Sequence, residues 1–387
     1  MGKELIVMTS TLPRWKNDSE ASFVLEFAKY IKPYFKDVVI LAPHVKGAEY
    51  NEVLDGVHIE RFKYFREKLC YDEGMFFKKK KFLNKLSIPS FVYNTYRKLR
   101  ETTTAFEWPY LNTAVVFAWY FPQGLAAYIN KLLHKHDYYI MLPGTDVYGG
   151  KGFISKFLFK KVLKNAKQIF VLSTAVQKHL VEKYGFNSVV MPLGVPKKLV
   201  KKISNRKRGH KILCLGRLVI QKGFQYAIRA VNDLVEKDDK YCDVRLTIAG
   251  SGDYLNDLKN LAASHIDFIG AVPHSKVYEL FRKHDLFLFP SLSGKNGTES
   301  FGLVAVEAMM NGIPIIASDV GGIPDIVIHN KTGGLVPEAD IDALEQSIEY
   351  VFNNPKKIDK IRKQAVQHVL KNFTWEAICK KYMRYLK

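Results

Sequence analysis

The stretch HDLFLFPSLSGKNGTESFGLVAVEAMMNG, residues 284–312, predicts a strand, a loop and a helix in succession. Its first eight residues, HDLFLFPS, contain a short apolar run, as in a buried strand, and its last twelve form a helical run that ends at Gly312. Two glutamates stand eight positions apart, Glu299 in the loop and Glu307 in the helix. Residues eight apart do not share one face of a helix. We therefore expect a loop residue and a helix residue to meet at one place.

Short apolar runs like this one recur along the whole chain, each followed by a longer amphipathic stretch. The runs are LIVMT, VVILAP, AVVFAW, YYIML, IFVLS and VVMPL in the first half, and KILCLG, VRLTIAG, IDFIG, LFLFP, IPIIAS and GGLVP in the second. Uninterrupted apolar strands separated by helices indicate a parallel sheet covered on both faces. The strands are too many for one small sheet, so the sequence predicts an α/β protein with two Rossmann-like, doubly wound domains facing across a cleft.

Composition restricts the partners more than the fold. The chain has 387 residues, 47% of them hydrophobic, and a formal net charge of +21 from 59 Lys and Arg against 38 Asp and Glu. Such an excess favours phosphates, anionic lipid or nucleic acid as partners. The four cysteines are scattered without a CxxC pair, which indicates free thiols in a reducing compartment. The apolar run near the start is too short for a signal peptide.

Residues 108–130 carry no charge, and their length approaches that of a membrane span. Pro122, Gln123 and Gly124 interrupt the run. AVVFAW followed by GLAAYIN fits a strand, a turn and a helix in a buried core better than a membrane helix, which stays the weaker alternative.

Four pieces of the second half resemble, in order, the family 4 retaining glycosyltransferases, which have the GT-B fold. They are GRLVIQKGF (216–224), FIGAVPHSKVYELFRKHDLFLFPS (268–291), ESFGLVAVEAMMNGIPIIASDVGGIPDIV (299–327), which contains the E-x7-E motif, and FTWE (373–376). The resemblance implies an acceptor-binding domain at 1–195, a linker at 196–210, a nucleotide-sugar donor domain at 211–370 and a C-terminal helix at 371–387 that returns to the first domain.

The resemblance also implies roles for individual residues. Glu299, Arg217 and Lys222 are the expected catalytic residues: Arg217 and Lys222 hold the donor diphosphate, and Glu299 binds the transferred sugar. Fixed cations stabilise the charge that builds on a departing phosphate. Glu307 is expected to bind the ribose hydroxyls. The remaining expected donor contacts are Gly216, Ala271, Val272, Phe301, Gly302 and Leu303, and LPGTDV places Thr145 and Asp146 on the acceptor or sugar side.

Each of these residues also has a plainer interpretation. Arg217 and Lys222 are alternatively ordinary surface charges after a strand. Glu307 is alternatively a solvated glutamate on a helix face, although its apolar neighbours argue against that. Glu299 is alternatively a helix cap, in competition with Ser300.

No metal and no cofactor are expected beyond the donor substrate itself. The sequence DID at 340–342 superficially matches a metal-binding Asp-x-Asp motif. It opens the predicted helix ALEQSIEYVF, where acidic residues suit the N-terminus, so a metal role is not expected. The histidines show no metal-ligand spacing.

Residues 75–100 hold eight Lys and Arg, among them Lys78, Lys79, Lys80 and Lys81, and no acidic residue. Interleaved aromatic residues make this region typical of a surface for anionic lipid headgroups, with a solvated basic loop as the alternative. Nucleic-acid binding is not expected, because no recognisable binding module is present.

Together with the basic composition, the resemblance implies a metal-independent, retaining, hexosyltransferase-type enzyme that uses a UDP- or GDP-sugar and is located in the cytoplasm, peripheral at the inner membrane face. Its acceptor is expected to be a lipid-linked or cell-envelope glycan. A nucleotide-sugar epimerase of the same fold and a catalytically silent sugar-nucleotide-binding membrane scaffold remain alternatives.

Overall fold

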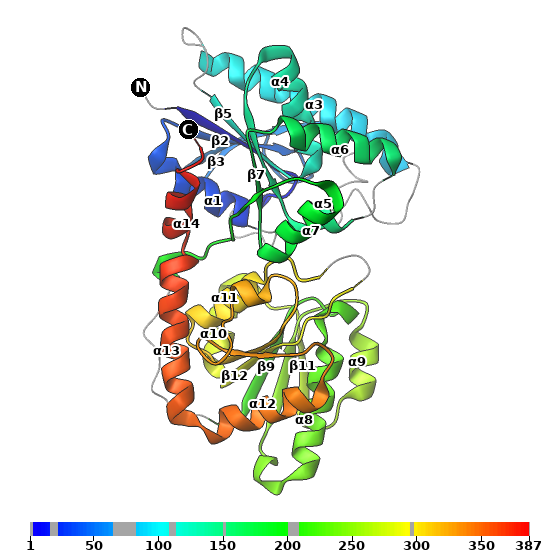
Figure 1. The fold of residues 1–387 in the computed structure, drawn as a ribbon, viewed down its shortest axis with the longest axis vertical. Coiled ribbons are helices and arrows are strands. Elements are labelled where there is room, and N and C mark those ends of the chain that lie inside the picture. Colours follow the sequence, from blue (N-terminus) through cyan, green and yellow to red (C-terminus); the bar gives the residue numbers. More distant parts are fainter. Residues whose placement is uncertain are drawn as a thin grey trace. The chain divides into compact units, whose positions relative to one another are not determined.

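The computed structural model describes residues 3–15, 22–64, 83–107, 114–149, 152–199, 209–294 and 298–386. The chain divides into two compact units (Figure 1). The first unit comprises Met1–Leu172, Val176–Met191 and Ile378–Lys387, and the second comprises Ser173–Ala175 and Pro192–Ala377. Residues 200–208 of the predicted linker lie outside the described residues. The domain boundaries taken from the sequence stay predictions.

The first unit is built on an eight-stranded sheet of order β3-β4-β2-β1-β5-β6-β7-β8. The strands are β1 (Glu4–Met8), β2 (Val38–Pro43), β3 (Asn51–Leu54), β4 (Val57–Phe62), β5 (Ala114–Trp119), β6 (Tyr138–Leu142), β7 (Gln168–Val171) and β8 (Val189–Val190). The pairs are parallel, with Ile6 of β1 opposite both Val39 and Val116, except that β3 pairs antiparallel with β4. All six apolar runs predicted in this half are strands, and the β3–β4 hairpin is an addition.

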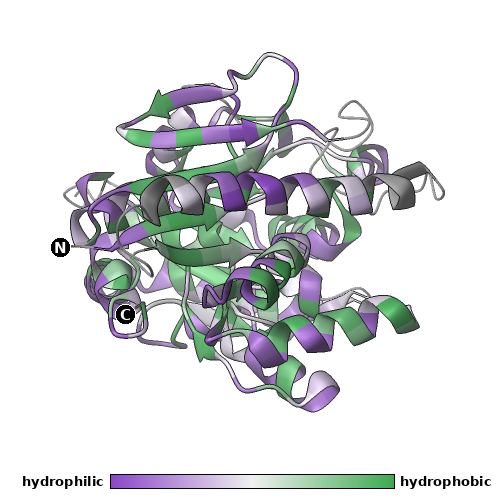
Figure 2. Cartoon of the chain, turned by 90° about the horizontal axis from the view of Figure 1, so that it is seen from above, coloured by the Kyte–Doolittle hydropathy of each residue, from purple (hydrophilic) through white to green (hydrophobic). Residues whose placement is uncertain are grey.

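Helices surround this sheet and bury its side chains. They are α1 (Phe23–Ile31), α3 (Leu83–Glu107), α4 (Phe121–His134), α5 (Gly144–Tyr148), α6 (Phe153–Asn165), α7 (Thr174–Tyr184) and α14 (Trp375–Tyr382), with a short 3-10 turn at Lys32–Tyr34. The strands in the middle of the view in Figure 2 are coloured as hydrophobic, as expected for a sheet covered on both faces.

The uncharged segment 108–130 is a strand and a helix where the structure describes it, β5 and the start of α4, as the sequence predicts. Among the described residues, none of the helices has the length and apolar character needed to cross a membrane. The membrane-helix alternative for this segment is therefore wrong over residues 114–130.

The second unit has a six-stranded, wholly parallel sheet of order β11-β10-β9-β12-β13-β14. Its strands are β9 (Lys211–Leu215), β10 (Arg245–Ala249), β11 (Ile266–Gly270), β12 (Leu286–Phe289), β13 (Ile315–Ser318) and β14 (Gly334–Val336). In chain order this is 3-2-1-4-5-6, the doubly wound arrangement. The strand order reverses between β9 and β12, where such sheets bind ligands at the carboxyl ends of the strands.

The helices of the second unit complete this arrangement. They are α8 (Phe224–Lys237), α9 (Leu255–Leu261), α10 (His274–Lys283), α11 (Leu303–Met310), α12 (Ile341–Asn353) and α13 (Pro355–Asn372), with 3-10 turns η3 (Ile220–Lys222), η4 (Asp239–Tyr241) and η5 (Ile323–Asp325). All six apolar runs of this half are strands, so the α/β prediction with two doubly wound sheets is confirmed.

The C-terminal segment 378–387 belongs to the first unit. The ring of Tyr382 is fully buried there, with its centroid 5.0 Å from that of Phe27 on α1 and 5.1 Å from that of Phe170 on β7. Figure 1 shows α14 in red beside α1 in blue. Burial raises the pKa of the Tyr382 hydroxyl well above its ordinary value.

Candidate functional site

An ion pair stands where β9 and β12 end, at the reversal of strand order in the second unit. Lys222 lies in the turn after β9, and Glu299 lies in the loop after β12. The Lys222 Nζ donates a hydrogen bond to Glu299 Oε2 over 2.5 Å and lies 5.2 Å from the centre of the Phe289 ring. About one fifth of each charged side chain is exposed. The structure thus brings together two of the residues that the sequence predicts as catalytic.

Backbone contacts hold both ends of this pair in place. Gly223 has a φ of +68°, and a Cβ there would lie 1.7 Å from the carbonyl oxygen of Pro290. Gly321 has a φ of +57°, and a Cβ there would lie 2.2 Å from the carbonyl oxygen of Glu299. The Gly322 N–H donates to that same oxygen over 2.8 Å. Positive φ values favour glycine, and only glycine permits such close approach, so the loop that carries Glu299 is fixed from two sides.

The start of α11 does not support the interpretation of Glu299 or Ser300 as a helix cap. The helix begins at Leu303, and its N-cap residue is Gly302, which makes no side-chain capping hydrogen bond. The capping interpretation is therefore wrong for both residues. Phe301 is buried beside this helix start. An uncapped helix N-terminus at the end of a strand is suited to an anionic ligand.

Glu307 lies in the middle of α11 and is 7% exposed, so it is not a solvated surface glutamate. Its Oε1 is 2.8 Å from Nε2 of His274, the first residue of α10. Ala271 and Val272, the predicted base contacts, lie in the short connection between β11 and α10, with Pro273 between them and His274. The carboxylate predicted to bind ribose therefore contacts the first residue of the helix that follows the predicted base-binding connection.

His274 is a residue that the sequence analysis did not select. It stands within the quoted motif FIGAVPHSKVYELFRKHDLFLFPS, but only the folded chain shows its contact with Glu307. Its ring also packs edge-on against Tyr278, with ring centroids 5.6 Å apart. We therefore add His274 to the candidate donor residues.

Arg217 lies beyond Gly216, where β9 ends, and its side chain is exposed. Among the described residues, no ion pair involves its guanidinium. Arg217 therefore presents its charge to solvent on the segment that also carries Lys222, whereas Lys222 is already paired. The two predicted phosphate ligands differ in this respect.

In the first unit, Thr145 and Asp146 lie on the short helix α5. Thr145 is exposed, whereas Asp146 is buried and its Oδ2 accepts a hydrogen bond from the backbone N–H of Phe121 over 3.2 Å. This contact anchors the first residue of α4 and gives Asp146 a structural task. A role for either residue in acceptor or sugar binding stays a prediction.

The first unit has its own reversal of strand order, between β1 and β5. Tyr120 directly follows β5 and has a φ of +76°, which is unusual for a residue other than glycine. Its hydroxyl is 3.4 Å from Oγ1 of Thr11, which follows β1. Burial raises the pKa of Tyr120 to about 12. Sequence reasoning missed this pair, because no local pattern signals a positive φ at a tyrosine.

Two other predictions concern residues outside this site. The Asp340 side chain caps α12 by accepting a hydrogen bond from the Ala343 N–H over 2.9 Å, which confirms that DID opens a helix. Lys78, Lys79, Lys80 and Lys81 lie outside the described residues. In the part of the chain that the structure describes, no three histidine, cysteine or acidic side chains gather as metal ligands do.

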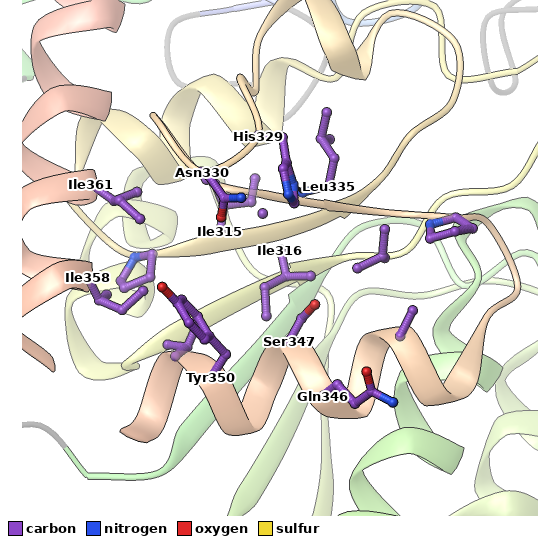
Figure 3. Close-up of a pocket in the computed structure, with 17 residues that line it drawn as sticks. Ile315, Ile316, His329, Asn330, Leu335, Gln346, Ser347, Tyr350, Ile358 and Ile361 are labelled. Atoms are coloured by element: carbon purple, nitrogen blue, oxygen red, sulfur yellow. Dashed lines mark hydrogen bonds between the residues drawn. The ribbon is translucent and has the colours of Figure 1, made fainter. Parts of the chain in front are cut away.

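A cavity of about 340 Å³ lies elsewhere in the second unit (Figure 3). Edge strand β14, strand β13 and helices α12 and α13 form its walls, and most of the lining side chains are apolar, among them Ile315, Ile316, Leu335 and Ile358. None of the predicted donor residues lines it. This cavity is therefore distinct from the Lys222–Glu299 site.

Comparison with known proteins first identifies the class. The Anabaena protein HepE, solved in complex with UDP, matches over 99% of this chain and 98% of its own, with a TM-score of 0.72 and 17% sequence identity. The fold is that of the GT-B glycosyltransferases. Residues 196–368 match the model of the family described as "Glycosyl transferases group 1". The resemblance to family 4 glycosyltransferases is thereby confirmed.

Two curated relatives match over similar stretches. An uncharacterized glycosyltransferase of Methanocaldococcus jannaschii is 33% identical over 181 residues, which are 46% of this chain and 44% of the relative. The GDP-mannose-dependent alpha-(1-6)-phosphatidylinositol monomannoside mannosyltransferase of Mycolicibacterium smegmatis is 30% identical over 171 residues, which are 42% of this chain and 44% of the relative. The chain thus spans less than half the length of these relatives.

Proposed function

We propose that this protein is a metal-independent, retaining glycosyltransferase that moves a sugar from a UDP- or GDP-sugar to an acceptor. The observation that carries the proposal is the Lys222–Glu299 ion pair at the carboxyl ends of β9 and β12, with the buried Glu307 on the helix that follows. The family match over residues 196–368 supports the same class of reaction.

In the proposed reaction the bond between the anomeric carbon and the diphosphate oxygen breaks, and its electron pair leaves with the phosphate. Lys222 and Arg217 stabilise this departing charge, because cations fixed before the reaction need no reorganisation during it. Glu299 accepts hydrogen bonds from hydroxyls of the sugar and stabilises the positive charge at the anomeric carbon. An acceptor hydroxyl then forms the new bond on the same face and gives its proton to the departing diphosphate oxygen. Glu307 binds the ribose hydroxyls of the nucleotide.

In this proposal, donor binding begins with the opening of the Lys222–Glu299 ion pair. In the structure, the ammonium of Lys222 is neutralised by Glu299 at 2.5 Å. A diphosphate and a sugar hydroxyl offer the two side chains new partners of suitable chemistry, an anion for the lysine and a donor for the carboxylate. Donor binding therefore exchanges one internal ion pair for two contacts with the substrate.

The acceptor is proposed to be a lipid-linked or cell-envelope glycan, bound by the first unit. The mannosyltransferase relative is named for a phosphatidylinositol-linked acceptor and for GDP-mannose, and the solved relative HepE is named with UDP. Both nucleotides therefore belong in the assay. Peripheral contact with an anionic membrane at the cytoplasmic side is part of the proposal, and nucleic acid is not an expected partner.

The test is nucleotide release from a panel of UDP-, GDP- and ADP-sugars, with and without lipid extract and with and without EDTA. Release from one donor, increased by extract and unchanged by EDTA, is the expected result. Consumption of a nucleotide sugar without any transfer would indicate an epimerase, and nucleotide binding without turnover would indicate a scaffold. Both outcomes would contradict the proposal.

A pair of lysine variants separates the site from general effects of charge. Lys222→Ala is expected to lower release by at least 100-fold, a loss of about 2.7 kcal/mol in transition-state stabilisation. Lys237→Ala is the matched control, since Lys237 also pairs with a glutamate, Glu345 at 2.7 Å, but at the far end of α8. Equal losses of nucleotide release in both variants would contradict the assignment of Lys222 as a phosphate-binding catalytic residue.

A further inference from the structure

Helix α6 of the first unit presents large apolar side chains to solvent. Its inner side packs against the core through Phe159, Val162 and Leu163, all buried. On its outer side Phe153, Ile154 and Phe157 are 88%, 73% and 55% exposed. Single exposed apolar residues are ordinary, but three large ones within five positions of one helix form a patch that soluble proteins rarely leave uncovered.

The same outer face continues as a row of lysines. Lys160, Lys161 and Lys164 follow Phe157 by three, four and seven positions, which places them on its side of the helix. All three are exposed, and the Lys161 Nζ lies 5.5 Å from the centre of the Phe157 ring. Helix α6 contains no aspartate or glutamate. Its outer face is therefore apolar over the first turns and positively charged over the rest.

This combination selects among the possible occupants. A second copy of the chain packed symmetrically on this face would set lysines against lysines, which costs free energy. A protein partner would need an acidic rim around an apolar pocket. An anionic bilayer offers phosphates and an apolar interior within a few ångströms of each other, and helices with exposed aromatic residues beside lysines bind there.

We propose that the outer face of α6 docks on anionic membrane, with Phe153, Ile154 and Phe157 among the acyl chains and the lysines at the headgroup phosphates. This surface is separate from residues 75–100, where the sequence predicts membrane contact. It is built from described residues alone, and it does not depend on the chemistry at Lys222 and Glu299. Helix α6 packs against α4 in the first unit, so the docking helix has a fixed support (Figure 1).

The experiment is co-sedimentation of the full chain with vesicles of phosphatidylcholine alone or mixed with phosphatidylglycerol. Wild type is expected to bind the anionic vesicles only, and less at high salt. Phe153→Ser combined with Phe157→Ser should weaken binding at least tenfold and keep the salt dependence. Lys160→Glu combined with Lys164→Glu should weaken it by at least 20-fold, from roughly fivefold per lysine, and flatten the salt dependence.

Matched controls are Val53→Ser, which removes an apolar side chain that is 59% exposed on β3, and Lys283→Glu on α10 of the second unit. Both should bind vesicles like wild type. Phe157→Trp provides a direct readout, because insertion into acyl chains shifts tryptophan emission to shorter wavelength. The shift should appear with anionic vesicles only.

Equal binding by wild type and the α6 variants would overturn the proposal, as would binding that ignores the anionic lipid. Self-association that depends on Phe153 and Phe157, measured by sedimentation without lipid, would instead assign the face to a second copy. Nucleotide release with the water-soluble donor, measured on the same preparations, reports on the transferase site alone. Loss of one activity with the other intact therefore shows which of the two proposals has failed.

Discussion

Replacing Glu299 by Gln tests the proposed site most directly, because it should change binding and turnover in opposite directions. In the wild-type chain Glu299 neutralises Lys222 at 2.5 Å. Gln has the same shape and still accepts hydrogen bonds from sugar hydroxyls, but it carries no charge. The lysine then has no charged partner to lose when a diphosphate binds.

The structure sets the size of both effects. Both side chains are about one fifth exposed, so the ion pair is treated as a partly screened one, worth about 0.5–1 kcal/mol. Removing it should tighten the binding of UDP or GDP by about two- to fivefold. Turnover loses the charge that faces the anomeric carbon, at a cost of about 3–4 kcal/mol, which lowers the rate by roughly 100- to 1000-fold.

Calorimetric titration with UDP and GDP measures the first effect, and nucleotide release from the preferred donor measures the second. Glu345→Gln is the matched control, since Glu345 is the partner of Lys237, and it should change neither quantity. If Glu299→Gln weakens nucleotide binding by the same factor as it lowers turnover, the division of roles between sugar and phosphate is refuted.

Three further predictions follow from the geometry. Glu307→Gln should weaken nucleotide binding by about 5- to 30-fold, because a charged acceptor is replaced by a neutral one; His274→Ala should weaken it less, and calorimetry on both variants checks the order. Gly321→Ala should lower the free energy of unfolding by about 1–3 kcal/mol, since a Cβ would lie 2.2 Å from the Glu299 carbonyl oxygen at a φ of +57°; urea unfolding measures it, and an unchanged midpoint would contradict it. Because the pKa of Tyr120 is raised to about 12, the unfolded chain loses this proton near pH 10 and the folded chain retains it. Stability should therefore fall between pH 10 and 12, by about 1.4 kcal/mol per pH unit at most, and Tyr120→Phe should lessen the fall seen in urea titrations at these pH values.

The strands were the most predictable part of the fold. Twelve apolar runs in the sequence are twelve strands in the structure, because strands buried on both faces show an uninterrupted apolar pattern. The β3–β4 hairpin was missed, since its residues alternate in burial and its edge strand is largely exposed. A local signal was present in the Asp55–Gly56 turn, where both residues have positive φ.

The candidate site was also predictable only in part. The motif set places Lys222, Glu299 and Glu307 after strands and on a helix, and the structure brings the first two into contact. Burial of Glu307 agrees with its apolar neighbours in sequence. The contact of His274 with Glu307 and the positive φ of Tyr120 have no sequence signal, because both depend on segments that meet only after the sheets form.

The sequence by itself determined the strands, the doubly wound class of both sheets and the residue types available for the donor, because apolar periodicity and motif spacing are local properties of the chain. Only the tertiary structure decided which charges neutralise each other and which aromatic residues stay in water. Phe153 on α6 is 88% exposed and Phe159, six residues later on the same helix, is fully buried. Hydrophobicity alone does not distinguish them. What distinguishes the two residues is which of them lies on the face of α6 that packs against the core.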